Sequence, residues 1–586
     1  MQALVGFLLF DLLLLAAGFG VLAALLGGLD LRTALTGVGI AFWLGAATVG
    51  LLLTLLAVAT GIGPRREVVV LCCLAVAVGG ALCAWLRRGP QVSLDQPGRF
   101  GSFEALFAAV VALAVALLFV VAYSLPLNEW DGWAFWLPKA KALALSGSLE
   151  PETLASFSGT DYPLLVPMLH GAAFSVADTT NEIAIHLQTW ILAAGFLGAL
   201  WFLLRTRVVP ALLWPFLAVA AVLPELDRRV LQVDGDYPSI FAFVLGAVAL
   251  MLWVESGGSG HRAAWALGTA VIFLAAAAAS KREGAIYLVA AFAGAFAATA
   301  PDWRRRWGAL LWALSIGLAT LLPWRAWIAS NEVMADSPSP RGVVSQAASE
   351  DGTRLTTALT SVLDYVFRVD YWSVAPVLGL LLVGAALVGR PRRLAVFATT
   401  TLIIVLLAMV WRALWWGGED EVEASSIPRI SGLVSLLLLA VGPMLAAELL
   451  RPLELPSVLK TARRMLDRAG SAIWIALALL PGTGALALAA ARGDFRFLEA
   501  AECRSEARAG EETLVVFGRT SSFAEARALQ ARAIEVGFQG TDIGPDACAR
   551  LRVHVQVKSP KIGRELQAEA KTVNLHPTLE PADGPP

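Results

Sequence analysis

Charged residues are scarce in this chain of 586 residues. They make up 16% of it, whereas 58% of the residues are hydrophobic and the mean hydropathy is +0.69. A soluble protein of this length needs a larger charged surface to stay in water. The formal net charge of -1 also excludes a global basic field of the kind that binds nucleic acids. The composition therefore excludes both the soluble and the nucleic-acid-binding classes.

Cysteine and histidine are also rare, with 5 of each in the chain. So few cysteines cannot form a disulfide scaffold, and no cluster has the ligand spacing of a zinc site. The sequence has no Walker loop, no dinucleotide fingerprint and no nucleophile elbow. Cys503 and Cys548 flank a predicted strand and helix in the polar tail, so we expect them to form a disulfide in an oxidising compartment.

Long apolar runs are abundant in the first 491 positions. Most contain about 17 to 25 residues, the length that crosses roughly 30 Å of hydrocarbon as a helix. The domain 1–491 is therefore predicted to be an all-α polytopic membrane domain with about 14 spans. A shorter run at 162–177 contains prolines and favours a re-entrant or interfacial segment. The predicted spans are 3–28, 35–61, 67–86, 104–125, 182–204, 208–224, 237–254, 262–279, 284–300, 307–329, 372–389, 394–410, 429–450 and 471–491.

Basic residues between these spans predict the orientation, because short cytoplasmic loops are enriched in Lys and Arg. If the segment 162–177 does not cross the membrane, five basic clusters all fall on the cytoplasmic side. They lie at 87–88, 205–207, 304–306, 390–393 and 460–468. Arg65 and Arg66 are the exception and fall on the opposite side. That non-cytoplasmic side then carries the first large loop, 126–161, and the loops 225–236, 280–283, 330–371 and 411–428.

The chain turns polar after Arg492, on the same non-cytoplasmic side. Apolar residues at 513–517 predict a strand, and the alternation over 551–557 predicts a second one. A helix is predicted between them. We therefore expect a small extramembrane α+β module over 492–557, and the Pro-rich stretch 558–586 is typical of a disordered tail.

Two carboxylates follow a predicted span directly, in the segment 128–141. An aromatic belt at the membrane interface would explain Trp133 and its neighbouring tryptophans. It does not explain Glu129 and Asp131, because charge at the lip of the bilayer is costly unless it has a partner or a function. A proline in the first turn and a glycine after the last one predict a short interfacial helix at 138–146.

Three further polar segments open or join spans on the same side. Asp236 follows Asp234 at the start of a span, where an ordinary capped helix is one interpretation. Lys281 lies in the link 280–283, where a tight hairpin needs polar residues. A cation on this side runs against the positive-inside bias and would suit a phosphate. Arg429 opens a later span, either as a snorkelling interfacial arginine or as a second phosphate ligand.

The order of these motifs resembles the GT-C superfamily of integral membrane glycosyltransferases. That superfamily includes dolichyl-phosphate-mannose protein mannosyltransferases and bacterial aminoarabinose lipid A transferases. The resemblance covers about 100–430, and at Leu164 the family has a second proline. It rests on Glu129-Trp130-Asp131, Lys139, Asp161-Tyr162-Pro163-Leu164, the acidic Asp236, the turn Lys281-Arg282-Glu283-Gly284 and Arg429.

The resemblance implies a polyprenyl-phosphate-sugar donor and a direct displacement at the anomeric carbon with inversion. Asp131 would be the base for the acceptor hydroxyl, with Glu129 as the alternate. Lys281 and Arg429 would stabilise the leaving phosphate. The other substrate contacts would come from Asp236, Tyr162, Lys139 and Trp133.

No dedicated metal ligands are predicted, although Glu129, Asp131 and Asp236 could together form an oxygen site for a divalent cation. The expected partners are the lipid-linked donor, an envelope glycan, lipid or protein acceptor, and a bacterial inner membrane. A transporter or flippase of lipid-linked sugars is the alternative, and it would carry mid-bilayer charges and paired broken helices. A non-catalytic scaffold for envelope assembly is the third hypothesis.

Overall fold

The structure is a computed structural model. It describes residues 2–87, 101–124, 131–151, 154, 157, 159–180, 182–226, 233–333, 353–389, 392–415, 427–450, 512–518, 541–545, 551–557 and 575–580.

The helices are α1 (Gln2–Leu26), α2 (Leu31–Thr36), α3 (Val38–Thr60), α4 (Arg66–Arg87), α5 (Ser102–Ser124), η1 (Asp131–Trp136), α6 (Leu137–Ser146), α8 (Leu165–Ala177), α9 (Glu182–Leu204), α10 (Pro210–Ala221), α12 (Asp236–Glu255), α13 (Gly260–Ser280), α14 (Gly284–Thr299), η2 (Ala300–Asp302), α15 (Trp303–Ala319), α16 (Leu322–Ser330), α18 (Thr353–Phe367), α19 (Val369–Trp372), α20 (Ala375–Val388), α21 (Arg392–Trp415) and α23 (Ile427–Leu450). The strands are β1 (Glu512–Gly518), β2 (Thr541–Pro545), β3 (Leu551–Val557) and β4 (Leu575–Glu580).

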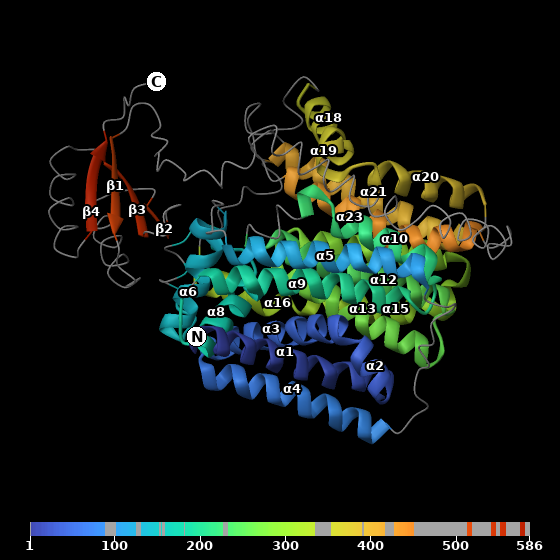
Figure 1. The fold of residues 1–586 in the computed structure, drawn as a ribbon, viewed down its shortest axis with the longest axis horizontal. Coiled ribbons are helices and arrows are strands. Elements are labelled where there is room, and N and C mark those ends of the chain that lie inside the picture. The colour runs from blue at the N-terminus through green and yellow to red at the C-terminus, as the bar shows by residue number, and fades with distance from the viewer. Residues whose placement is uncertain are drawn as a thin grey trace.

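Ten helical segments in the described part of the chain are long and apolar enough to cross a membrane. A helix satisfies all its interior N–H and C=O groups within itself, which hydrocarbon requires of any spanning segment. The chain is therefore a polytopic membrane protein whose described bundle is all-α, as predicted for the membrane domain. In Figure 1 these helices run side by side across the view, with α6 and α8 at the left end and α2 at the right.

The predicted number of about 14 spans is not confirmed, since the described residues hold ten such segments. The run predicted at 208–224 forms only the 12-residue α10, which rises about 18 Å. The run at 372–389 forms the 14-residue α20, bent by 115° from α18 and α19. In both runs some apolar residues lie in turns outside the helix, so the length of the apolar run exceeds the length of the helix. The span predicted at 471–491 lies outside the described residues.

One of the ten segments contains a hairpin. Gly284–Ser330 holds 47 residues, and as one straight helix it would measure about 70 Å, twice the hydrocarbon thickness. The ring of Phe296 lies 5.4 Å from that of Trp307, on the far side of η2. A Cβ on Gly317 would lie 2.7 Å from Leu288, so α15 runs back along α14. The two predicted spans at 284–300 and 307–329 therefore correspond to the two arms of this hairpin.

Burial separates central helices from peripheral ones. In α12, 94% of the apolar window is buried within the protein, whereas only 17% is buried in α4 and in α5. Figure 1 accordingly shows α12 and α13 within the bundle and α4 at its lower edge. A helix that is apolar on all sides is stable in either place, because its outer face meets lipid instead of water.

The two ends of the bundle differ in their side chains. Arg207 pairs with Glu255, the last residue of α12. Arg306 donates a hydrogen bond of 3.2 Å to the carbonyl oxygen of Val254. The predicted basic loops 205–207 and 304–306 thus meet at one end, which we call the basic end. Asp236 begins α12 at the opposite end, which holds the candidate site.

The short segments near the site follow the predictions. Helix α6 matches the predicted helix at 138–146 and ends at Gly147, whose φ of +62° is easy only for glycine. The run 162–177 forms the 13-residue α8, too short to cross alone. Arg65, the exception to the charge rule, donates a hydrogen bond of 2.9 Å to the carbonyl oxygen of Gly147. It thereby ties the link before α4 to the end of α6.

Four strands of the polar tail form one antiparallel sheet in the order β2-β3-β1-β4. β1 and β3 confirm the strands predicted at 513–517 and 551–557. Within the stretch 558–586, predicted to be a disordered tail, residues 575–580 form β4, which pairs with the edge of β1 that β3 leaves free. The predicted helix between β1 and β3, and the cysteines of the predicted disulfide (Cys503 and Cys548), lie outside the described residues.

Candidate functional site

Three of the residues singled out in the sequence meet at the end of the bundle opposite the basic end. Lys281 Nζ forms a hydrogen-bonded ion pair with Asp236 Oδ1, and both side chains are almost fully buried. Arg429 Nε lies 3.6 Å from Asp236 Oδ2. The side chain of Arg429 is 22% exposed, against 4% for Lys281, so the arginine is the more open of the two cations.

The hairpin of α12 and α13 brings Asp236 to Lys281. Ser239 Oγ donates a hydrogen bond of 2.9 Å to the carbonyl oxygen of Ala277, which fixes the register of the two antiparallel helices. One turn further, the start of α12 meets the link after α13. A Cβ on Gly284 would lie 2.0 Å from the carbonyl oxygen of Ala277, so only glycine lets α14 begin this close to α13.

The start of α12 is capped by Asp234 and not by Asp236. Asp234 Oδ1 accepts hydrogen bonds from the backbone N–H groups of Asp236 and Tyr237, at 3.0 and 3.3 Å. Such a cap satisfies donors that have no partner within the helix. The carboxylate of Asp236 is therefore not used for capping, and both of its oxygens face cations.

A second ion pair supports the link between α13 and α14. Arg412 Nε lies 3.2 Å from Glu283 Oε1, and the two side chains are 9% and 11% exposed. Burial alone would raise the pKa of Glu283, but Lys281 and Arg412 outweigh it and lower that pKa. Burial alone would lower the pKa of Lys281, but Asp236 and Glu283 outweigh it and raise that pKa. Lys281 and Glu283 are therefore both charged at neutral pH.

The segment before α8 is held against the same link. Arg282 Nη1 lies 3.0 Å from Asp161 Oδ2, and its guanidinium carbon lies 4.0 Å from the centre of the Tyr162 ring. Trp324 Nε1 donates a hydrogen bond of 3.3 Å to the carbonyl oxygen of Asp161. Tyr162 is 9% exposed, and its contact with substrate stays a prediction.

Lys139, predicted to contact substrate, is 2% exposed. Its Nζ donates a hydrogen bond of 2.6 Å to the carbonyl oxygen of Gly159 and lies 3.7 Å from the centre of the Phe135 ring. These contacts tie α6 to the segment before α8. The structure thus gives Lys139 a role in the fold, and a direct contact with substrate remains a prediction.

The carboxylates predicted to act as bases cannot be placed as side chains. Glu129 and the side chains of Asp131 and Trp133 lie outside the described residues. The backbone of η1 is described from Asp131 onwards, and its last residue is Trp136. A Cβ on Gly235 would lie 2.4 Å from the Trp136 ring, so η1 ends against the turn that opens α12. The segment bearing Asp131 therefore leads directly to the Asp236 site.

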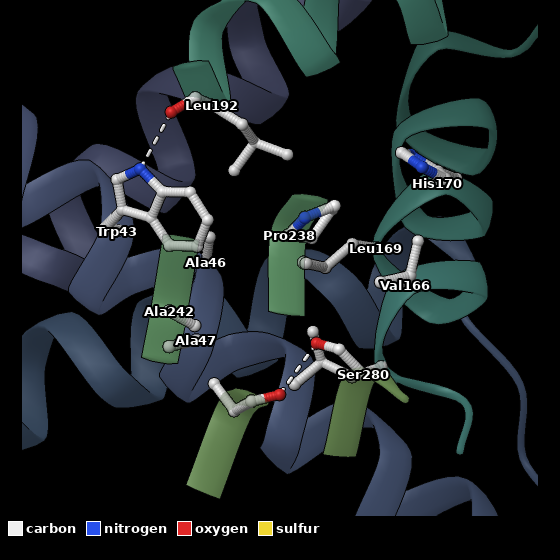
Figure 2. A pocket seen from close by; sticks show the side chains of 12 residues that line it. Trp43, Ala46, Ala47, Val166, Leu169, His170, Leu192, Pro238, Ala242 and Ser280 are labelled. Carbon is white, nitrogen blue, oxygen red and sulfur yellow. Dashed lines mark hydrogen bonds between the residues drawn. The ribbon is translucent and has the colours of Figure 1, made fainter. Parts of the chain in front are cut away.

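A small apolar pocket lies beside the start of α12 and the end of α13 (Figure 2). Its walls include Pro238 and Ser280, close neighbours of Asp236 and Lys281 in the chain. Figure 2 shows Trp43 and Leu192 on one side and His170 and Val166 on the other. His170 Nδ1 lies 2.7 Å from Gln188 Oε1. Neither Asp236 nor Lys281 lines the pocket.

No cluster of three or more His, Cys, Asp or Glu side chains suited to a metal occurs among the described residues. Of the predicted oxygen site, only the side chain of Asp236 is described, and cations occupy both its oxygens. The sequence-based prediction left Glu283 and Arg412 out of the site. The sequence feature that could have identified this pair is the opposite charge of the two residues at the ends of predicted spans.

Comparison with protein-family models, with curated proteins and with solved structures finds no match for this chain.

Proposed function

We propose that the protein is a glycosyltransferase that moves a sugar from a polyprenyl-phosphate-linked donor to an acceptor at the membrane surface. The site end would face the non-cytoplasmic side of a bacterial inner membrane. The polar tail would form an α+β module on that side. The proposal builds on the resemblance to the GT-C superfamily and on the geometry of the Asp236 site.

One observation carries the proposal. Asp236, Lys281 and Arg429 come from three separate helix ends and converge at one end of the bundle. Charged groups at this depth are costly unless they have a function or partners, and here they gather at one point. A lipid-linked sugar phosphate has its charged group at this same depth, with the lipid in the bilayer and the sugar outside.

The chemistry would be a substitution at the anomeric carbon of the donor sugar. A bond forms from the acceptor oxygen to that carbon, and the bond to the phosphate oxygen breaks. The polyprenyl phosphate leaves with the electron pair, and the acceptor proton goes to a carboxylate, for which Asp131 is our candidate and Glu129 the alternate. Charge grows on the leaving phosphate, where Arg429 and Lys281 would stabilise it.

The two cations would act differently. Arg429 is the more exposed, so an incoming phosphate would meet its guanidinium first. Lys281 is already paired with Asp236, and a phosphate would have to compete with that carboxylate for the ammonium group. Such an exchange is more favourable for the leaving phosphate monoester than for the donor diester, because the monoester carries more negative charge.

The test is reconstitution of the purified full chain in liposomes with radiolabelled polyprenyl-phosphate sugars and an extract of envelope acceptors. The expected result is transfer of label to an acceptor with release of polyprenyl phosphate. Arg429→Met should reduce this transfer, and Arg304→Met should not, because Arg304 is exposed at the basic end.

Movement of the intact labelled lipid across the bilayer, with no bond broken, would support the transporter alternative. That alternative calls for a pair of broken helices. The described part of the chain has one strongly bent pair, α18–α19 with α20. Mass spectrometry of envelope glycans and glycoproteins from a deletion strain would name the sugar and the acceptor.

A further inference from the structure

A buried cation that forms no ion pair with any described residue lies at the basic end. Arg205 follows α9 directly and is 5% exposed. Its Nε is enclosed and has no hydrogen-bond partner. Its guanidinium carbon lies 5.0 Å from the Trp201 ring centre and 4.5 Å from that of Phe202. Within the described part of the chain, no carboxylate pairs with it.

Two other arginines at this end, the buried Arg306 and the partly exposed Arg207, have partners. Arg306 contacts Asp302 at 3.3 Å and the carbonyl oxygen of Val254 at 3.2 Å. Arg207 pairs with Glu255. An uncompensated buried charge destabilises the folded state, and pairing with an opposite charge offsets this cost. Arg205 has no ion-pair partner among the described residues, so its position suits an anion from outside the chain.

Asp30 attracts Arg205 electrostatically but forms no ion pair with it. Asp30 Oδ1 accepts a hydrogen bond of 2.7 Å from the backbone N–H of Thr33 and caps α2. Burial lowers the pKa of Arg205 to about 10, so the guanidinium remains charged at neutral pH. The adjacent cation, Arg32, is exposed on α2 and would add to the attraction for an anion.

The surroundings of Arg205 are apolar on the side of α2. A Cβ on Gly37, between α2 and α3, would lie 3.2 Å from the ring of Phe202, so this junction packs beside the guanidinium. Leu31 and Leu35 are 76% and 69% exposed and lie one helical turn apart on one face of α2. Two exposed leucines beside two arginines match a lipid, whose acyl chains and phosphate are joined in one molecule.

We propose that Arg205 and Arg32 form a binding site for the phosphate of an anionic phospholipid headgroup, with the acyl chains against Leu31 and Leu35. The guanidinium fork of Arg205 suits a phosphate diester, which can accept two parallel hydrogen bonds. The site lies at the opposite end of the bundle from the Asp236 site and is independent of the proposed glycosyl transfer.

The test uses the purified full chain in detergent, with native mass spectrometry to count bound lipid. Phosphatidylglycerol and phosphatidylcholine are titrated separately. A charge-assisted contact of about 1.5 kcal/mol corresponds to about a tenfold difference in affinity. We expect the wild-type chain to prefer phosphatidylglycerol by about tenfold and Arg205→Gln to lose that preference. The matched control Arg304→Gln removes an exposed cation from the same end and should retain it.

Three outcomes would overturn the proposal. The first is equal binding of the two lipids by the wild-type chain, and the second is an unchanged preference in Arg205→Gln. The third is loss of bound phosphatidylglycerol on addition of millimolar inorganic phosphate, which would identify a soluble anion as the ligand. If Arg205→Gln does not fold, Arg32→Gln decides, because that side chain is exposed. It should weaken phosphatidylglycerol binding about threefold, and an unchanged affinity would refute the site.

Discussion

The ion pair between Asp236 and Lys281 can be tested as a structural element, independently of any reaction. The perturbation is a double-mutant cycle made of Asp236→Asn, Lys281→Met and the double variant. Both side chains are at most 4% exposed, so each single variant leaves a buried charge without its main partner. Breaking a buried pair in this way costs about 3–5 kcal/mol.

The two single variants should differ in cost. Asp236→Asn leaves Lys281 with only Glu283 as a nearby anion, so we expect a loss of about 3 kcal/mol. Lys281→Met leaves Asp236 beside Arg429, at 3.6 Å, and should cost about 2 kcal/mol. The double variant removes both charges and should lie close to the less harmful single variant. The resulting coupling energy is about 2–3 kcal/mol.

The assay is reversible unfolding of the purified chain in mixed micelles of increasing SDS content, followed by circular dichroism. The control cycle uses Arg393 and Asp302, a pair at 2.9 Å whose side chains are 47% and 36% exposed. Water screens that pair, so its coupling energy should be below about 1 kcal/mol. A coupling energy for Asp236 and Lys281 as small as that of the control would refute the buried geometry.

The pH dependence of the same measurement follows from the pKa shifts. The pKa of Lys281 is raised above its ordinary 10.5, so its contribution is complete below that value and is lost as the pH rises through the folded pKa. The pKa of Glu283 is lowered below its ordinary 4.5, so its contribution is complete above that value and is lost as the pH falls through the folded pKa. The stability contributed by Lys281 and Glu283 should therefore be constant between about pH 6 and 9, and a slope in this window would contradict the assignment.

Three predictions concern activity and orientation. Arg429→Met should weaken donor binding about tenfold, measured by competition with polyprenyl phosphate, while Lys281→Met should mainly lower turnover. Asp131→Asn should keep the fold and reduce transfer about 100-fold, and near-normal transfer would remove its role as the base. In a cysteine-free background, an impermeant thiol reagent outside the cell should label Ser148→Cys, near the site end, and not Ser256→Cys, which follows α12 at the basic end. Labelling of both positions would contradict the orientation.

The contact between Asp236 and Lys281 could have been predicted from the numbers of residues in the two helices that it joins. Helix α12 has 20 residues and α13 has 21, and a short turn joins them. Antiparallel helices of equal length bring the first residue of one beside the last residue of the other. The sequence-based prediction named both residues but expected Lys281 to hold an anion from a ligand. Hydropathy locates helix ends, and it does not show which charges at those ends pair with each other.

Contacts between elements distant in the chain could not be counted in this way. Arg412 of α21 meets Glu283, and Arg282 meets Asp161 in the segment before α8, where elements distant in the chain pack against the link 281–283. Most spans are apolar on all sides, so the periodicity of the sequence does not indicate which face meets a neighbour. The order of the motifs therefore predicted that these residues lie at one end of the bundle. It did not predict which side chains form ion pairs with each other.

The pairing of Lys281 with Asp236 changes how a phosphate clamp would work at this site. A free ammonium group would contribute to donor affinity directly. A paired one contributes only the difference between its contact with phosphate and its contact with the carboxylate, and the two contacts are similar in strength. That difference grows as the phosphate gains charge on leaving the sugar, so it lowers the barrier more than it strengthens donor binding. Arg429 is more exposed and lies 3.6 Å from the same carboxylate, so it would lose a weaker contact on binding phosphate. It would therefore contribute mainly to donor affinity. Asp236 would then determine how the two cations divide binding and catalysis, which is a role for a carboxylate that is neither base nor metal ligand.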